Sequence, residues 1–212
     1  MAAGVWDEYY GPASDGDTAS IVVTLTRPES RGAIRLRSTD PADGPVIDPR
    51  YLSADGDAGV LLQGIRMAQR VVDTAAMRAV GVALVATPFP PCRHHEDDSD
   101  AYWLCFVDHL SVTMYHPVGT CKMGPAADAT AVVDARLRVH GVDGLRVADA
   151  SVMPVIVNGN TNAPSIMIGE KAADMILQAW SSASSSSTAS RAPSGAGVGA
   201  GAADVGRGSV EL

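Results

Sequence analysis

The pattern of apolar and polar residues near the start of the chain predicts an antiparallel hairpin. Residues 20–27 (SIVVTLTR) are rich in β-branched side chains and end before a proline, as strands commonly do. Residues 33–38 alternate apolar and polar side chains, which is typical of a second, half-exposed strand. Residues 29–32 between them have turn chemistry, and Gly32 is free to take a positive φ. Residues 40–49 are crowded with Pro, Gly and Asp, and we expect them to form a loop.

Helical spacing begins at about Asp55. Apolar side chains then recur every three or four residues, at Leu61, Ile65, Ala68, Val72 and Ala75. This spacing predicts a long amphipathic helix. A shorter helix is predicted from a cap at Ser99 or Asp100 to roughly Leu110, because both side chains can accept hydrogen bonds from free backbone N–H groups.

The last helix is predicted from about Ala163 to Trp180. Pro164 suits a first helical turn, and an apolar stripe follows, made of Ile168, Ala172, Met175, Ile176 and Ala179. Residues 166–168 are apolar on all sides, so we expect this end of the helix to be buried inside a larger body. From residue 181 onward the chain is mostly Ser, Ala and Gly. Such a segment cannot offset its ordering entropy, and we expect it to be disordered.

The remaining short elements indicate an α+β fold class. Residues 111–115, 145–149 and 155–157 are strand-like. Together with the hairpin they predict a mixed, largely antiparallel sheet with flanking helices. The expected divisions are a partial linker (1–19), a main domain (20–144), a returning strand and helix (145–180) and a tail (181–212).

Composition and charge narrow the class of protein. The 212 residues are 46% hydrophobic, which allows a sizeable core, and 16 basic against 24 acidic residues give a net charge of −8. A nucleic-acid binder would show a basic patch, and none is visible. No apolar run reaches the roughly 20 residues of a membrane-spanning helix, and no secretion signal is visible. Cys92, Cys105 and Cys121 are too few and too scattered to indicate a disulfide framework, which favours a reducing, intracellular compartment.

The most specific candidate chemistry lies in Met114-Tyr-His-Pro-Val-Gly-Thr-Cys-Lys-Met-Gly124. This segment holds His116 between a predicted strand end and a glycine-rich turn. Histidine is the side chain best suited to accept a proton near neutral pH. The alternative is a core histidine satisfied by a backbone carbonyl, and from the residues alone the two interpretations are even.

A second polar segment, residues 158–164 (NGNTNAP), leads directly into the last predicted helix. Free backbone N–H groups and the positive end of the helix dipole would face a ligand there, which favours an anionic or electron-rich group. The alternative is ordinary N-capping by Asn162, worth about 1 kcal/mol. Capping explains one of the three asparagines in this segment and leaves two unexplained.

Metal binding is a third interpretation, and it is disfavoured. Cys92, His94 and His95 with Asp97 and Asp98 resemble a metal cluster, but neighbours in a loop rarely supply a closed tetrahedral site, so no metal site is predicted. No Gly-x-Gly-x-x-Gly follows a strand, and no Gly-x-Ser-x-Gly elbow is present. The chain therefore carries neither a dinucleotide fingerprint nor a serine-hydrolase motif of its own.

Taken together, the His116 segment and residues 158–164 resemble the glucose–methanol–choline (GMC) family of flavoprotein oxidoreductases, and most closely its choline-dehydrogenase-like branch. The similarity runs from about Ile21 to Ile176. Its other parts are residues 27–32 (RPESRG), 46–52 (VIDPRYL), 64–66 (GIR), 133–154 and 158–173. The resemblance implies that residues 20–144 form the substrate-binding domain, and that residues 145–180 return to the FAD-binding domain.

The resemblance also implies a reaction, the FAD-dependent oxidation of an alcohol CH–OH group with hydride passing to the flavin. His116 matches the family's general base, which takes the substrate hydroxyl proton. Asn160 matches a partner that hydrogen-bonds the substrate oxygen without taking a proton. The substrate is expected to be a small alcohol, and the electron acceptor either a quinone or dioxygen.

The same resemblance implies which residues touch the cofactor. Asn162, Ala163 and Pro164 match a stretch whose backbone approaches the pyrimidine side of the flavin. Asp149 and Ala150 match a turn at the ribityl–diphosphate part of FAD. Met114, Tyr115 and Trp103 are placed near the substrate cavity.

The chain departs from the family pattern in one respect, because it does not contain the dinucleotide-binding glycines. In the family these glycines lie N-terminal to the part that this chain resembles. The chain is therefore expected to be one part of a longer or split enzyme. The alternative is a non-catalytic, truncated fragment that retains only the fold core or a binding surface.

Overall fold

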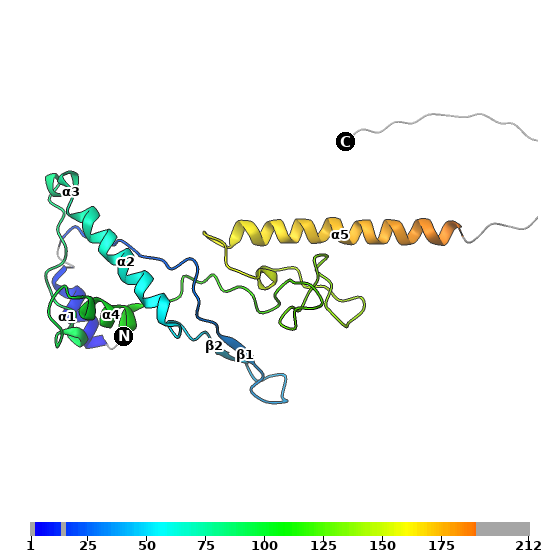
Figure 1. The fold of residues 1–212 in the computed structure, drawn as a ribbon, viewed down its shortest axis with the longest axis horizontal. Helices are drawn as coiled ribbons and strands as arrows, with labels where there is room; N and C mark the ends of the chain where they lie inside the picture. The colour runs from blue at the N-terminus through cyan, green and yellow to red at the C-terminus, as the bar shows by residue number, and fades with distance from the viewer. Residues whose placement is uncertain (1–2, 14–15, 190–212) are drawn as a thin grey trace, which may run out of the picture. The chain divides into compact units, whose positions relative to one another are not determined.

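The computed structural model describes residues 3–13 and 16–189 of the chain, whose fold is shown in Figure 1. The chain divides into two compact units, residues 1–172 and 173–212. The elements of the first unit are α1 (Ala3–Tyr10), η1 (Gly11–Ala13), β1 (Ala33–Arg35), β2 (Val46–Asp48), α2 (Asp55–Val72), α3 (Ala75–Ala79), η2 (Pro90–Cys92), α4 (Asp100–Leu110) and η3 (Ala150–Val152), where η denotes a 3₁₀ helix. Helix α5 (Asn162–Ala189) begins in the first unit and continues as the described part of the second.

The helix predicted from about Asp55 is confirmed as α2, but it ends at Val72, and α3 follows as a separate helix. Thr74 lies between the two. Its hydroxyl accepts a hydrogen bond from Met77 N at 3.4 Å and donates one to Val71 O at 2.8 Å. A threonine hydroxyl that bonds nearby backbone groups competes with the hydrogen-bond ladder of the helix, which explains a break within a continuous apolar pattern.

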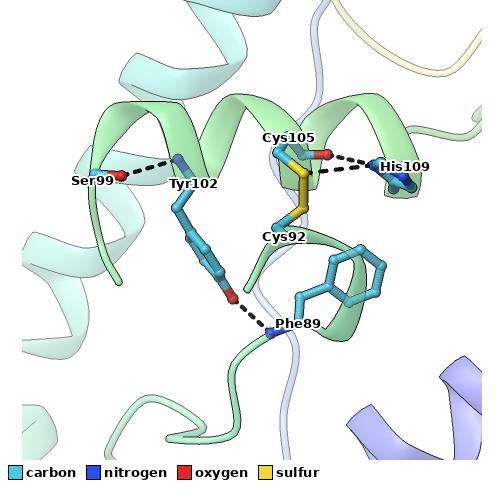
Figure 2. Close-up of a disulfide and its surroundings, with 6 residues drawn as sticks. All are labelled: Phe89, Cys92, Ser99, Tyr102, Cys105 and His109. Carbon is cyan, nitrogen blue, oxygen red and sulfur yellow. Dashed lines mark hydrogen bonds between the residues drawn. A yellow bond between two sulfur atoms is a disulfide. The ribbon is translucent and has the colours of Figure 1, made fainter. Parts of the chain in front are cut away.

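The predicted short helix is confirmed as α4, with Ser99 at its N-cap, where the hydroxyl accepts from Tyr102 N at 3.1 Å. Helix α4 packs against α2, and Figure 1 shows the two next to each other. Phe89, Cys92 and Tyr102 form a buried cluster, in which Phe89 N donates to the Tyr102 hydroxyl at 2.8 Å (Figure 2). The cluster therefore ties the loop before α4 to the helix itself.

Helix α1 forms over residues 3–10, where the sequence shows no clear periodic element. The Tyr9 ring packs edge-on against Phe89 and Phe106, with ring centroids 5.2 and 6.0 Å apart. Burial in this aromatic group is the main reason that the pKa of Tyr9 is raised to about 12, with smaller contributions from Tyr102 and Tyr10. Aromatic packing from outside the segment thus gives α1 its place.

The hairpin differs from the predicted one in its strands. β1 pairs antiparallel with β2, with Ile34 opposite Ile47, so the partner strand lies within residues 40–49, where a loop was expected. Gly32 does not take a positive φ. A Cβ at Gly32 would instead overlap the carbonyl oxygen of Asp48 and the backbone of Pro49, so this glycine permits a close approach of two backbones rather than a tight turn.

The strand predicted over residues 20–27 is wrong. Ile21 and Val22 are exposed, and Val23 contacts α2 at Gly64 instead of entering a sheet. β-branched residues favour a strand only where a neighbouring strand offers a hydrogen-bond ladder, and here a helix surface takes that place.

The other predicted strands are also absent as strands. Residues 111–115 and 155–157 have no β-structure, and residues 145–149 contribute only the isolated bridge between Arg138 and Arg146. Within the described ranges the sheet consists of β1 and β2. The α+β class therefore holds in its coarse form, while the larger mixed sheet is not observed in this part of the chain.

The last predicted helix is confirmed as α5, which begins at Asn162. Ile168 and Ala172 are buried, whereas Ile166 and Met167 are exposed, so only one face of the first turns packs within this chain. The helix continues through residues 181–189, where the sequence predicts disorder. Extending an existing helix fixes only one residue for each hydrogen bond gained, and Ala and Ser are compatible with such an extension. Residues 190–212, the rest of the predicted tail, lie outside the described residues.

The cysteines also differ from expectation. Cys92 and Cys105 form a disulfide, and Cys121 is free and half-buried. Folding brings Cys92 of η2 beside α4, a proximity that the spacing of 13 residues does not reveal. Disulfides are rare in reducing compartments, so this pair removes the basis for favouring one. No described helix is both long and apolar enough to span a membrane.

Candidate functional site

The imidazole of His116 lies beside the hydroxyl of Thr161, with Nδ1 and Oγ1 3.0 Å apart. The two residues are 45 positions apart in the chain, His116 half-buried and Thr161 only 9% exposed. Tyr115, directly before the histidine, has a φ of 61°, which is uncommon for a bulky residue and turns the chain sharply at this point. The structure therefore brings the two segments singled out in the sequence into direct contact.

The position of Thr161 explains why its hydroxyl is available to His116. Helix α5 begins at Asn162, and Thr161 O accepts from Ser165 N at 3.0 Å and from Ser165 Oγ at 2.6 Å, so Thr161 occupies the N-cap position. An N-cap hydroxyl usually accepts from the N–H group two or three residues on. Pro164, three residues on, has no N–H, and the hydroxyl turns to the imidazole instead.

This geometry also bears on two alternatives left open by the sequence. The cap position belongs to Thr161 rather than Asn162, so capping does not account for Asn162. The partner of His116 is a side-chain hydroxyl rather than the backbone carbonyl expected of a merely satisfied core histidine. Sequence reasoning missed Thr161. The available signal was a hydroxyl residue three positions before a proline at a helix start.

The hydrogen bond constrains what His116 can do chemically. When Nδ1 carries the proton it donates to Thr161 Oγ1, and Nε2 keeps a free lone pair. When Thr161 donates instead, Nε2 carries the proton. The arrangement can therefore hold the tautomer in which Nε2 accepts a proton from a bound hydroxyl.

Backbone hydrogen bonds fix the segment after His116 to the turn that contains Asp149. Cys121 N donates to Ser151 O at 3.0 Å, and Met123 N donates to Val152 O at 2.9 Å. Val152 is fully buried at this junction. The predicted base and the turn predicted to touch the cofactor are thus parts of one hydrogen-bonded arrangement.

A side-chain lock shapes the next turn of the same segment. Lys122 Nζ donates to Asp128 Oδ2 at 2.7 Å, and the Thr130 hydroxyl donates to Asp128 Oδ1 at 2.6 Å. The hydrogen bond from Lys122, followed by those from Thr130, holds the pKa of Asp128 well below its usual range. The turn is therefore held by an ionised carboxylate at neutral pH.

Asn160 is exposed and lies one residue before Thr161. The structure shows no hydrogen bond between the Asn160 and His116 side chains, both of which are described. The exposed amide of Asn160 is therefore not tied to the imidazole.

The two segments predicted to touch a cofactor both have hydrogen-bond donors that a bound group could use. Asp149 Oδ1 accepts from Ser151 N at 2.7 Å and so shapes η3, and Ser151 Oγ is a buried hydroxyl without a hydrogen-bond partner in the described structure. At the start of α5 the N–H groups of Asn162 and Ala163 have no intrahelical acceptor, because the residues four positions before them lie outside the helix. Both places offer donors to an electron-rich group, and a flavin dinucleotide is such a group.

Trp103 does not join this site. Its Nε1 donates to Asp98 Oδ1 at 2.7 Å, and its ring packs against Phe106 in the cluster around α4. Met114 and Tyr115 are exposed next to His116. Of the three residues expected near a substrate cavity, the structure therefore leaves two beside the imidazole and accounts for Trp103 by packing.

Comparison with known proteins gives a consistent result. A family model described as GMC oxidoreductase matches residues 28–169. The chain is 44% identical over 162 residues to glucose dehydrogenase [FAD, quinone] of Drosophila pseudoobscura pseudoobscura, covering 76% of this chain and 26% of that protein. It is 43% identical over 154 residues to the mitochondrial choline dehydrogenase of Mus musculus, covering 73% and 25%.

Solved structures agree. A fungal aryl-alcohol oxidase superposes with a TM-score of 0.62 at 34% sequence identity, covering 74% of this chain and 25% of the oxidase. The chain thus spans about a quarter of the length of the relatives it matches.

Proposed function

Because the chain belongs to the GMC oxidoreductase family, we propose that it carries the substrate-side catalytic groups of an FAD-dependent enzyme that oxidises an alcohol CH–OH group. The family predicted from the sequence is confirmed, as are the oxidoreductase class and FAD as the family's cofactor. The relatives include glucose, choline and alcohol dehydrogenases, so alcohol oxidation is the shared chemistry. The narrower likeness to choline dehydrogenase stays a prediction.

The contact between His116 and Thr161 is the single observation that carries the proposal. FAD, when bound, supplies the hydride acceptor. In the tautomer that the proposal requires, His116 Nδ1 donates to Thr161 Oγ1, and Nε2 is left to accept the proton of the substrate hydroxyl. The exposed amide of Asn160 donates to the substrate oxygen and holds it in place without taking a proton itself.

The residues that would hold FAD lie in the two places with free donors. The N–H groups of Asn162 and Ala163 and the positive end of α5 suit the electron-rich side of the flavin, and Pro164 suits the first turn because it has no N–H that would need a partner. The turn at Asp149 and Ala150, with the unpartnered Ser151 hydroxyl, suits the ribityl–diphosphate part. The dinucleotide-binding glycines would come from elsewhere in the enzyme.

A His116→Ala substitution tests the proposal in the assembled, FAD-loaded enzyme. We expect kcat to fall roughly 100-fold or more, because loss of a general base typically costs 10²–10⁴-fold. The FAD absorbance at about 450 nm should be retained, because His116 is not among the proposed cofactor contacts. A kcat close to that of the unsubstituted enzyme would refute the assignment of the base.

Asn160→Ala serves as a graded comparison in the same assay. It should reduce kcat less than His116→Ala and raise KM, because Asn160 orients the substrate and takes no proton. An equal loss of kcat from both variants, with KM unchanged, would contradict the separate roles. FAD titration of the chain, alone and mixed with the dinucleotide-binding part of the enzyme, tests the non-catalytic alternative. That alternative requires that the folded chain does not bind FAD by itself and does not restore flavin binding to the other part.

A further inference from the structure

A second cluster of reactive side chains, made of residues other than those of the proposed site, surrounds the disulfide in Figure 2. Cys105 and His109 are one turn apart on α4, and Cys92 reaches them from η2. Ligand atoms of these three residues all lie within 4.8 Å of one another. In particular, Cys105 Sγ is 3.8 Å from His109 Nδ1, and the same nitrogen is 2.9 Å from the Cys105 carbonyl oxygen.

This grouping replaces the metal cluster considered from the sequence. That cluster paired Cys92 with His94 and His95, but the rings of these two histidines pack against each other, with centroids 4.0 Å apart. The structure instead gives Cys92 two partners from α4. Residues four apart on a helix share one face, so Cys105 and His109 can bind one ion together.

The surroundings suit a metal ion that binds sulfur and nitrogen. Two thiolates and an imidazole are preferred ligands of Zn²⁺, which is commonly four-coordinate in proteins. Cys92 is completely buried, Cys105 is half-buried, and His109 is exposed, so the cluster has an opening to solvent at its Cys105 and His109 end. That opening provides an entry path and room for water as a fourth ligand.

We propose that reduction of the Cys92–Cys105 disulfide converts this cluster into a Cys₂His site for Zn²⁺ or a similar soft divalent cation. A dithiol reductant supplies two electrons and two protons, the S–S bond breaks, and the reductant becomes a disulfide. On metal binding the two thiols release two protons to solvent, and both sulfurs bind as thiolates. His109 Nδ1, which as a proton carrier donates to the Cys105 carbonyl in the oxidised chain, releases that proton to solvent while Nε2 takes one up, and the lone pair on Nδ1 then binds the metal. The disulfide and the metal are thus alternative links between η2 and α4.

Cobalt binding to the purified chain tests the proposal, because tetrahedral Co²⁺–thiolate sites absorb visible light and report sulfur ligands directly. Cys121→Ser is used as background to remove the third, free thiol. After reduction and removal of the reductant, we expect one Co²⁺ per chain with a thiolate charge-transfer band. The oxidised chain should give no such band. Equal binding by the oxidised and reduced chains, or no binding by a reduced chain that keeps its helical circular dichroism, would overturn the proposal.

His109→Ala separates a built site from thiols that bind metal on their own. It keeps both cysteines and removes an exposed ring that touches the buried cluster only edge-on, at Phe89, and it should weaken cobalt binding by more than the roughly 10-fold that loss of an outer-shell partner costs. The matched control is His95→Ala in the loop between Cys92 and α4, which should leave binding unchanged. Unaltered affinity in His109→Ala refutes the role of the imidazole.

If reduction of the disulfide unfolds the chain, recovery of the fold on adding Zn²⁺ tests the proposal instead. If the reduced chain loses helical circular dichroism, Zn²⁺ should restore it in the Cys121→Ser background and fail to do so after Cys105→Ser. Failure of Zn²⁺ to restore the signal overturns the proposal.

Discussion

At the scale of single residues, we propose that the contact between Thr161 and His116 sets which imidazole nitrogen can accept a proton, with Nδ1 as the donor to Thr161 Oγ1. Thr161→Val keeps the shape of the side chain but leaves Nδ1 without its partner. In the assembled enzyme we expect kcat to fall about 10-fold, as for loss of one hydrogen bond worth roughly 1.4 kcal/mol. In the Thr161→Val chain alone, ¹⁵N chemical shifts of the His116 ring should report a mixture of the two tautomers. Thr161→Ser keeps the hydroxyl and should give a single tautomer, with the proton on Nδ1. An unchanged tautomer in Thr161→Val would contradict the positioning role, whatever the activity.

The carboxylate of Asp57 has a structural role, because it binds the backbone of residues 29 and 30. It is 2% exposed and accepts from Glu29 N at 2.7 Å and Ser30 N at 2.9 Å. Burial raises the pKa of Asp57, but hydrogen bonds from Ser30 and Glu29 and the charge of Arg31 outweigh it, so the pKa lies below its usual value.

The pH dependence of unfolding follows from this lowered pKa. A lowered folded-state pKa contributes stability that is complete above the unfolded-state value of about 3.9 and is lost as pH falls through the folded-state pKa. Asp57→Asn should therefore lower the free energy of unfolding by roughly 1–3 kcal/mol at neutral pH and flatten its decline in acid. Urea unfolding between pH 7 and pH 2 measures both effects. Parallel curves for the two proteins would disprove the assignment to Asp57.

At the scale of elements, the packing of residues 20–27 on α2 depends on Gly64. A Cβ at this position would overlap Val23 Cγ1, so Gly64→Ala should destabilise the fold by about 1–3 kcal/mol despite the better helix propensity of alanine. Gly59→Ala, on the same helix with open space around it, is the matched control and should be neutral or stabilising by up to about 1 kcal/mol. Denaturant unfolding distinguishes them, and Val23→Ala should relieve the first variant. Similar stabilities for both glycine variants would mean that the segment does not rest on α2.

The same scale shows why helices could be predicted and strand pairings could not. Helix α4 follows from a local cap and a local apolar spacing, both visible in consecutive residues. The pairing of β1 with β2 depends on a backbone approach at Gly32 that no local pattern encodes. In the site, the resemblance pointed to His116 and Asn160, whereas the contact with Thr161 spans 45 residues and rests on a missing N–H at Pro164. The Cys92–Cys105 disulfide escaped prediction for the same non-local reason.

At the scale of the whole molecule, the chain spans about a quarter of the length of its relatives, and it leaves large apolar side chains exposed at the start of α5. Met167 is 58% exposed there, one turn beyond the proposed flavin contacts at Asn162 and Ala163. Under the proposed function this surface is covered in the assembled enzyme by the FAD-binding part. Met167→Glu should then change the stability of the chain alone by only about 0.5 kcal/mol or less, as for an exposed position.

In the assembled enzyme the same substitution should be costly, because a carboxylate would be buried without a partner at a contact next to the cofactor. We expect Met167→Glu to lower the FAD content of the purified enzyme several-fold, measured as flavin absorbance per protein, while Val142→Glu leaves it unchanged. Val142 is the matched control because it is also about half exposed, at 51%, but lies in a loop that holds none of the proposed site residues. If Met167→Glu destabilises the chain alone, the side chain is already buried without the rest of the enzyme. If it alters neither the chain nor the FAD content, the start of α5 does not face the flavin, and the proposed contacts at Asn162 and Ala163 fall with it.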